Sequence, residues 1–329
     1  MVLGTPQNQQ TPLPENGLGR KLAIYGPSVE LYSELPELEK QIDATLGRFV
    51  VKELPESAGI IRGLLRRYSE AEVIRRLPLM AQPLHRQGDL TEIYHHEERY
   101  WTIDDRWGMS EINILRGQWQ SWVLPQPKLD SVRLLEAAAL WPLAQLLKAK
   151  NTWLAPSVSV ARGTFGALML SSIDLDSEVR ALAEDGFRLI GQRWTVIRET
   201  DEQLELLQVP GGIRAITPAG FDGVAPWEDL TAGHADRSQQ HAFCDAVICI
   251  EAARRPRAGI RKIPQQDAAA LLRRIWPIPE LHPSRRSPQL PSKLAQNCGC
   301  FVLQLSREPA DIVDLMQSIQ GMPVRNRVA

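Results

Sequence analysis

The sequence predicts a two-domain protein of the α/β class: a C-terminal α/β domain with a mixed sheet and flanking helices, preceded by a smaller α+β domain. Residues 161–197 read as strand, loop, helix and strand, which is the pattern of an α/β unit. Residues 90–124 alternate polar and apolar side chains, with aromatic residues among them, as in a small antiparallel sheet. We place the first domain at residues 21–127 and the second at residues 128–322.

The composition is that of an ordinary globular protein. The 329 residues suffice for a full core, and 43% are hydrophobic and 23% charged. A net charge of -1 gives no electrostatic reason to expect nucleic acid or an anionic membrane as a partner. The sequence has no apolar run of about 18 residues and no secretory signal. Its four cysteines fit a reducing compartment, so we expect a cytoplasmic protein.

The first domain is predicted to follow a disordered tail. Residues 1–20 are polar and rich in proline and glutamine, and residues 323–329 form a second tail. The pattern predicts strands at Lys21–Gly26 and Phe49–Val51 and helices at residues 34–46, 60–68 and 70–77. The basic face of the last two helices is most simply a solvated surface, with contact to an acidic partner as the alternative. It consists of Arg62, Arg66, Arg67, Arg75 and Arg76.

Five of the nine tryptophans lie close together in the sequence, namely Trp101, Trp107, Trp119, Trp122 and Trp141. The default interpretation places them in the core of the small antiparallel sheet. The alternative is an exposed aromatic platform for a peptide or protein partner. After this sheet, Asp130 is predicted to cap a long helix over Ser131–Lys148, which Pro142 should kink.

In the second domain, residues 161–197 resemble a nucleotide-binding unit without its phosphate loop. A buried strand at Gly166–Leu170 is followed by a polar loop, a helix at Ser177–Asp185 and a strand at Phe187–Ile190. A phosphate loop, G-x-x-x-x-G-K-S/T, would lie between the first strand and the helix. Further strands are predicted at residues 195–197, 203–209, 243–251 and 300–305, and further helices at residues 265–275, 292–297 and 310–320.

The segment in place of the phosphate loop has no glycine and no lysine. It consists of Ser171, Ser172, Ile173, Asp174, Leu175, Asp176 and Ser177. A phosphate loop uses glycines to converge backbone N–H groups on phosphate and a lysine to neutralise its charge. Asp174 and Asp176 would instead repel phosphate. We expect Asp176 or Ser177 to cap the following helix; a cation site on the two carboxylates is the weaker alternative.

Residues 141–320 resemble the HPr kinase/phosphorylase group, whose P-loop core is related to that of phosphoenolpyruvate carboxykinase. The motifs that carry the resemblance are PLAQLL, WLAPSVSVARGTFGALML, GFRLIG, VPGGIRAITP, VICIEAARRP, QQDAAALLRRIWP and CGCFVLQLSREPADIVDLM, in this order. The chain looks most like the HPr-kinase-related proteins found beside bacterial biosynthetic gene clusters. The resemblance implies an HPr-kinase-like C-terminal domain.

The sequence departs from this family at both parts of the phosphoryl-transfer site. The phosphate loop is degenerate, and the family's acidic pair is replaced by Gln192 and Arg193. Glutamine is a poor base, and arginine does not act as one. We therefore expect a pseudokinase-like protein with no catalytic residue, no cofactor and no metal.

Other residue types that can bind metals or catalyse reactions lack a specific pattern. His95 and His96 are adjacent, and adjacent strand residues point to opposite faces, so a solvated turn is the simpler interpretation. His234 and His241 come without a nucleophile motif. The cysteines are interpreted as buried free thiols, and a structural zinc site would require Cys244 and Cys249 to meet Cys298 and Cys300.

The expected function is to bind and position a partner protein or peptide, as an assembly, maturation or regulatory subunit of a bacterial biosynthetic system. In the related kinases, loops at one end of the sheet meet the protein substrate, and this end carries a basic run here: Arg254, Arg255, Arg257, Arg261 and Lys262. A solvated loop is the simpler interpretation of the run. The related kinases form symmetric assemblies, which makes a homo-oligomer an open expectation.

Two alternatives remain open from the sequence. One is an ATP-dependent kinase, acting on serine in a protein or on a small molecule, with Arg193 or the basic run replacing the missing lysine. The other is a sensor of an anionic ligand, without turnover, in which Arg193 anchors the anion.

Overall fold

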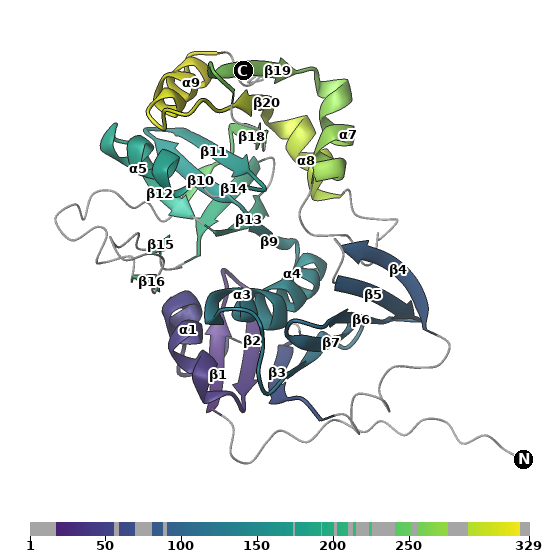
Figure 1. Ribbon diagram of the computed structural model, residues 1–329. Helices are drawn as coiled ribbons and strands as arrows, with labels where there is room; N and C mark the ends of the chain where they lie inside the picture. Colours follow the sequence, from purple (N-terminus) through teal and green to yellow (C-terminus); the bar gives the residue numbers. More distant parts are fainter. Residues whose placement is uncertain are drawn as a thin grey trace, which may run out of the picture. The chain divides into compact units, whose positions relative to one another are not determined.

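A computed structural model describes residues 18–55, 59–69, 81–87, 91–173, 175–191, 193–200, 203–209, 213–214, 224–225, 241–251, 255–275 and 289–322. It is a mixed α/β structure (Figure 1). The chain divides into two compact units, Met1–Lys40 with Phe49–Ala139 and Gln41–Arg48 with Leu140–Ala329. No helix of the described residues is long and apolar enough to cross a membrane. The predicted tail at residues 323–329 and most of that at residues 1–20 lie outside the described residues.

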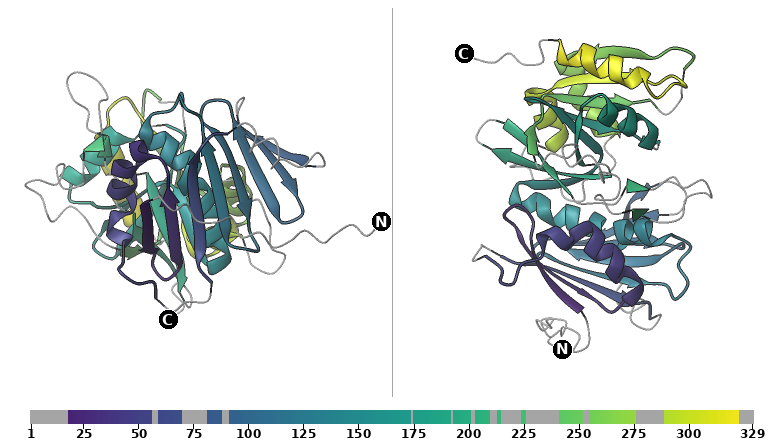
Figure 2. Two further views of the ribbon diagram at one scale, coloured as in Figure 1. Left: turned by 90° about the horizontal axis from the view of Figure 1, so that it is seen from below. Right: turned by 90° about the vertical axis from the view of Figure 1, so that its left-hand side faces the viewer.

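The first unit is built on an eight-stranded mixed sheet (Figure 2). Its strands are, in spatial order, β1 (Leu18–Ala23), β2 (Ser28–Ser33), β3 (Ile61–Arg67), β8 (Gln118–Val123), β7 (Gly108–Asn113), β6 (Arg99–Asp104), β5 (Thr91–His96) and β4 (Gln82–Gln87). Strand β3 pairs in parallel with β2 and β8, and the other pairs are antiparallel. The predicted antiparallel sheet over residues 90–124 is confirmed as β5 to β8.

Two predicted elements of this part of the chain are wrong. Residues 60–68 have helical spacing, yet Ile61–Arg67 forms β3, because pairing with a strand on each side outweighs local periodicity. Phe49–Val51 is not a strand: Gly47–Phe49 forms a 3-10 turn, and Val50 makes one isolated bridge to Leu22. The helix predicted at residues 34–46 is present as α1 (Pro36–Leu46). The predicted helix at residues 70–77 lies outside the described residues.

The described arginines of the predicted basic face lie next to acidic neighbours. Arg62 pairs with Glu30 at 2.9 Å, Arg66 with Glu34 at 3.0 Å and Arg67 with Glu37 at 3.1 Å, as a ladder that links β3 to β2 and the residues after it. Such half-exposed pairs contribute little to stability. Arg75 and Arg76 lie outside the described residues.

The tryptophans of the first unit belong to its core, so the default interpretation is confirmed and the exposed platform is wrong. Trp101, Trp107, Trp119 and Trp122 are each at most 3% exposed. Trp101 and Trp122 pack with Met109 on one face of the sheet. Trp119 is three residues before Trp122 on β8 and therefore lies on the other face of the sheet. There its Nε1 donates to the carbonyl of Ala138, in the helical segment, at 3.3 Å. Trp141 is half-buried.

The predicted long helix is present but changes type along its length. Its segments are α3 (Ser131–Leu135), a π-helical segment (Glu136–Leu140) and α4 (Trp141–Leu147). Asp130 caps α3 as predicted, accepting from the Arg133 N–H at 2.9 Å. Pro142 lies in the first turn of α4, where its missing N–H is tolerated.

The second unit has a six-stranded mixed sheet as its central layer (Figure 1). Its strands are, in spatial order, β12 (Arg188–Gly191), β10 (Val158–Arg162), β11 (Phe165–Leu170), β18 (Ala246–Ile250), β20 (Gly299–Gln304) and β19 (Gly259–Ile263). Strands β11, β18 and β20 run in parallel. Strands β10 and β19 run against their neighbours.

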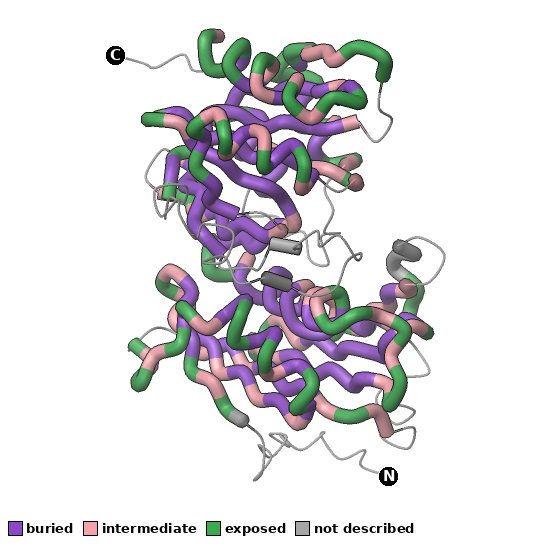
Figure 3. The backbone as a smooth tube through the Cα atoms, turned by 60° about the vertical axis from the view of Figure 1, so that its left-hand side comes forward, coloured by how far each residue is buried: buried purple, intermediate pink, exposed green. Residues whose placement is uncertain are grey.

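Both faces of the central sheet are covered, and its inner strands β10, β11, β18 and β20 are buried almost completely (Figure 3). On one face pack α5 (Asp176–Glu184) and α9 (Asp311–Gln320). On the other face pack α7 (Gln265–Ile275), α8 (Leu290–Asn297) and a second sheet. That sheet is antiparallel in the order β17 (His241–Phe243), β14 (Gln203–Gln208), β13 (Trp194–Thr200) and β9 (Thr152–Pro156). A short pair, β15 (Ile213–Arg214) and β16 (Val224–Ala225), completes the described strands.

Candidate functional site

The predicted strand–loop–helix–strand unit is confirmed as β11, α5 and β12. Strand β10 lies between β11 and β12 and is antiparallel to both, so β11 and β12 point the same way. The carboxyl ends of β11, β12, β18 and β20 therefore lie at the same end of the sheet, which we call its carboxyl end. In open α/β sheets the carboxyl end is where ligands bind.

The loop that leaves β11 closes on itself. The Ser171 hydroxyl donates to the Ile173 carbonyl at 2.9 Å and accepts from the Ile173 N–H at 3.1 Å. The Ile173 N–H, in the segment that stands in place of the phosphate loop, is thus bound within the turn. Ser172 is exposed beside it, and Asp174 lies outside the described residues.

The start of α5 carries two carboxylates but no side-chain cap. Leu175 occupies the N-cap position without a capping hydrogen bond, so the predicted cap at Asp176 or Ser177 is wrong. Asp176 and Glu178 instead lie in the first turn, where the positive end of the helix dipole favours negative charge. The Ser177 hydroxyl donates to Glu178 Oε2 at 2.8 Å.

Glu178 is the residue that the sequence analysis missed. Its side chain is 1% exposed, which is rare for a carboxylate. Its position two residues after Asp176, at the start of a helix, was the available signal. A buried carboxylate here adds to the charge that an incoming phosphate would have to overcome.

The polar groups at the carboxyl ends of β18 and β20 are also bonded to each other. Gln304 Nε2 donates to Glu251 Oε2 at 3.0 Å. The Ser306 hydroxyl donates to the Glu308 carbonyl at 3.1 Å and accepts from its N–H at 2.9 Å. The described polar groups that follow β18 and β20 therefore have partners within the chain.

The position of the replaced acidic pair follows β12. Arg193 is half-buried, and its carbonyl accepts from the Ser157 N–H at 2.9 Å. Gln192 lies outside the described residues. Next to them, a Cβ on Gly191 would lie 2.4 Å from the Trp194 carbonyl oxygen, so only glycine fits this tight reversal.

The basic run begins at the carboxyl end of the sheet, after β18, and continues onto β19. Arg255 and Arg257 are exposed before the strand, and Arg261 and Lys262 are exposed on it, so the run is solvated but only its first part is a loop. The Arg255 N–H donates to the Leu305 carbonyl at 2.8 Å, which fixes the start of the run against the end of β20. Arg254 lies outside the described residues.

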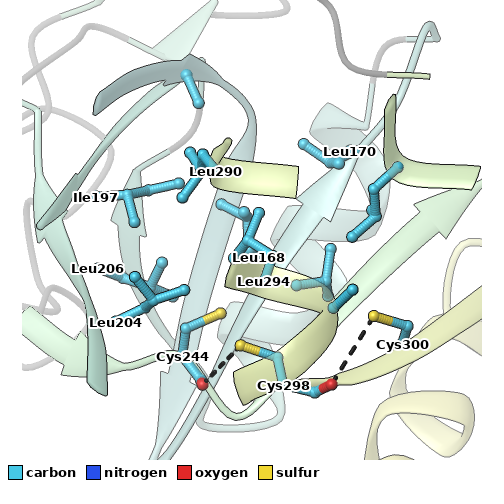
Figure 4. Close-up of a cluster of buried hydrophobic side chains, with 14 of the residues drawn as sticks. Leu168, Leu170, Ile197, Leu204, Leu206, Cys244, Leu290, Leu294, Cys298 and Cys300 are labelled. Carbon is cyan, nitrogen blue, oxygen red and sulfur yellow. Dashed lines mark hydrogen bonds between the residues drawn. The ribbon is translucent and has the colours of Figure 1, made fainter. Parts of the chain in front are cut away.

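All four cysteines are free and buried in the apolar cluster that includes α8. Figure 4 shows three of them, Cys244, Cys298 and Cys300. The two predicted cysteine groups do meet, since the Cys298 thiol donates to the Cys244 carbonyl at 3.1 Å. A separate side-chain hydrogen bond between the Cys244 and Cys298 thiols, together with burial, raises the pKa of the Cys244 thiol well above its ordinary value. Burial raises the pKa of Cys249, and mainly burial that of Cys300, to about 12.

Metal-binding residue types do not gather elsewhere in the described part of the chain. No group of three or more His, Cys, Asp or Glu residues there could hold a metal ion. His95 and His96 occupy successive positions of β5, hence opposite faces, so the solvated turn expected here is wrong. His241 is exposed, with Nδ1 3.3 Å from Glu205 Oε1, and His234 lies outside the described residues.

No protein-family model and no curated protein matches this chain. Among solved structures, the chain is similar to the Hpr(Ser) kinase/phosphatase from Coxiella burnetii. That match has 16% sequence identity and a TM-score of 0.32, and it covers 51% of this chain and 95% of that chain. A score this low carries no argument about the site, whose chemistry is set by the residues of this chain. The fold and site define a mixed α/β protein with a buried parallel core.

Proposed function

We propose that this chain is a catalytically inactive, HPr-kinase-like protein that binds and positions a partner protein or peptide. The partner would belong to a bacterial biosynthetic system, and the chain would act in its assembly, maturation or regulation. One observation carries the proposal: the loop after β11 is closed by the Ser171 hydroxyl, and Asp176 and Glu178 occupy the first turn of α5.

The physical argument is that this segment has no positively charged side chain to offer a phosphate, and that the Ile173 N–H is already bound within the turn. Glycine-rich phosphate loops leave several N–H groups free and add a lysine, whereas the sequence between Leu170 and Glu178 contains neither glycine nor lysine. Two carboxylates at the helix end use the dipole that would otherwise attract an anion. Retention of the strands and helix around a site of this kind is consistent with a binding role.

The test is nucleotide binding followed by thermal unfolding. ATP, ADP and a non-hydrolysable ATP analogue are each added with Mg²⁺, and the melting temperature is measured. A ligand at 100 times its Kd adds about 2.7 kcal/mol to the stability of the folded state, so binding would be visible. We expect no shift with any of the three. A shift with all of them would reject the inactive form of the proposal and favour an ATP-dependent kinase.

Arg193 supports one second candidate, a sensor of a small anion. It follows β12 at the carboxyl end of the sheet and is half-buried. Titration with inorganic phosphate, with wild type and an Arg193→Gln variant in parallel, tests it. Stabilisation that disappears in Arg193→Gln would favour the sensor, and equal behaviour of the two proteins would exclude Arg193 as the anchor.

A further inference from the structure

Strand β19 (Gly259–Ile263) forms one edge of the central sheet. In the described part of the chain its pairing partner is β20, along the register Gly259↔Gln304 to Ile263↔Cys300. The outer side of an edge strand presents backbone N–H and C=O groups that can pair with an added strand.

The region of β19 carries a strong positive charge. Between residues 255 and 275 there are six basic residues and one acidic residue, Asp267, which gives a net charge of +5 in a protein of net charge -1. The basic residues are Arg255, Arg257, Arg261, Lys262, Arg273 and Arg274. The imbalance favours an acidic partner over a neutral one.

The arginines around β19 also lack the ion pairs that arginines form elsewhere in the molecule. Arg162 pairs with Asp185 at 2.8 Å, and Arg198 pairs with Glu205 at 2.7 Å. Arg255, Arg257 and Arg261 are exposed and form no ion pair within the described residues. Exposed cations along a strand edge also prevent unspecific pairing with neutral strands.

The register fixes which residues a paired strand would need. Arg261 is opposite Val302 and Lys262 is opposite Phe301, so the two cations lie on opposite faces of the sheet. Ile260 packs against the core on the α5 and α9 face. Cross-strand neighbours share a face, so a strand added to β19 needs two adjacent acidic residues, with an apolar residue on the side of Ile260.

We propose that the outer edge of β19 binds an extended acidic segment of a partner polypeptide as an added strand. Two adjacent carboxylates of that segment lie opposite Arg261 and Lys262. The inference rests on the proposed binding function and specifies the partner's chemistry and the way it docks.

The test uses two capped synthetic peptides of equal composition and charge. One is Thr-Val-Glu-Glu-Val-Thr, with adjacent glutamates, and the other is Thr-Glu-Val-Val-Glu-Thr, with separated glutamates. Binding to the full chain is measured by fluorescence anisotropy at low salt. We expect the first peptide to bind about fivefold more tightly, because only it places both carboxylates opposite the two cations.

Variants of equal charge change separate the edge from general electrostatics. The double variant Arg261→Glu/Lys262→Glu should lower the affinity for the first peptide at least about tenfold, since it places like charges opposite each other. The control Arg180→Glu/Arg188→Glu changes the same net charge at exposed positions on α5 and β12. It should change the affinity by less than about twofold. Equal losses in both variants would overturn the proposal.

Strand pairing itself is read out by hydrogen exchange and by a modified peptide. Binding should slow exchange of alternate β19 amides, whose N–H groups point to the outer edge. A version of the first peptide with N-methyl groups on alternate amides cannot complete the ladder and should bind poorly. Equal binding of the N-methylated peptide, or unchanged exchange in β19, would reject strand addition.

The outcomes also distinguish this proposal from the function on which it rests. If no nucleotide binds and neither peptide binds, the edge of β19 is not the docking site, while the inactive binding role stands. If nucleotides bind, that role fails whatever the peptides do. Preferential binding of heparin over the first peptide, lost in Arg261→Glu/Lys262→Glu, would assign the edge to a polyanion and reject the peptide.

Discussion

The Ser121 hydroxyl donates to the carbonyl oxygen of Ala138 at 2.5 Å. In a regular α-helix this carbonyl would accept from the N–H of residue 142, and residue 142 is proline, which has none. Trp119 Nε1 donates to the same oxygen at 3.3 Å. The sheet of the first unit therefore supplies the donors that the helix lacks.

This relationship predicts a coupling between two substitutions. Ser121→Ala should lower the free energy of unfolding by about 1–2 kcal/mol, because it removes the shorter donor from a buried carbonyl. In a Pro142→Ala background the helix can provide an N–H to Ala138, so the cost of Ser121→Ala should be smaller by about 0.5–1 kcal/mol. Urea unfolding followed by tryptophan fluorescence measures all four proteins. The same cost in both backgrounds would show that Pro142 is not the reason for the contact.

Asp245 holds the start of β18 to β11. Its Oδ2 accepts from the buried Gly166 N–H at 3.1 Å, and its own N–H donates to the Gly166 carbonyl at 2.8 Å. Asp245→Ala should cost about 1–3 kcal/mol, because it leaves a buried donor unsatisfied. Asp245→Asn keeps an acceptor oxygen and should cost less than half as much. Chemical denaturation measures both, and equal costs would contradict this role of the carboxylate oxygen.

Gly166 itself allows the close approach of β17 to β11. A Cβ at this position would lie 2.2 Å from the Phe243 carbonyl oxygen, well inside van der Waals contact. Gly166→Ala should therefore cost about 3 kcal/mol or more, through displacement of backbone. Gly163→Ala serves as the matched control for added side-chain volume, since nothing lies within 4 Å of its Cβ, although its φ of +61° adds a smaller strain. A smaller cost at Gly166 than at Gly163 would contradict the packing argument.

The four thiols should be unreactive in the folded protein. With a pKa of about 12 at Cys249 and Cys300, only about one thiol in 10,000 is ionised at pH 8, and the thiolate is the reactive form. We expect no labelling by iodoacetamide at pH 8 in the native state and labelling of all four cysteines after denaturation. Mass spectrometry counts the labels. Rapid native labelling of Cys244 or Cys298 would show that this apolar cluster opens.

Asp104 should make stability depend on acidic pH. Burial by itself raises the pKa of Asp104, but hydrogen bonds from Arg106 and Thr91 outweigh burial and hold this pKa below its ordinary value. Because the folded-state pKa is the lower one, the stabilisation is present above the unfolded-state pKa and is lost as the pH falls through the folded-state pKa.

The measurement for Asp104 compares wild type with Asp104→Asn. At pH 7 the variant should be less stable by about 1–3 kcal/mol, because Arg106 loses a charged acceptor. The difference should shrink as the pH falls below about 4. A difference that stays constant between pH 7 and pH 3 would contradict a role for ionisation.

The sequence predicted the elements whose local pattern agreed with their surroundings. The unit β11, α5 and β12 follows from apolar runs around an amphipathic segment, and Asp130 predicted its own helix start. The helix predicted at residues 60–68 was wrong. The apolar spacing of Ile61–Arg67 suits a helix, but β2 and β8 pair with this segment as a strand. At the candidate site, the sequence predicted the loss of glycine and lysine. It did not predict that Glu178 is buried or that Leu175, rather than Asp176, occupies the N-cap.

By itself, the sequence determined that the residues between Leu170 and Ser177 lack phosphate-binding groups, and that residues 255–275 are strongly basic. Both are matters of residue type along the chain, which composition and spacing reveal. Only the tertiary structure decided that the Ser171 hydroxyl closes the loop and that β19 is a sheet edge with Arg261 and Lys262 on opposite faces. These facts depend on strand order and register, which are set by pairing between segments far apart in the sequence.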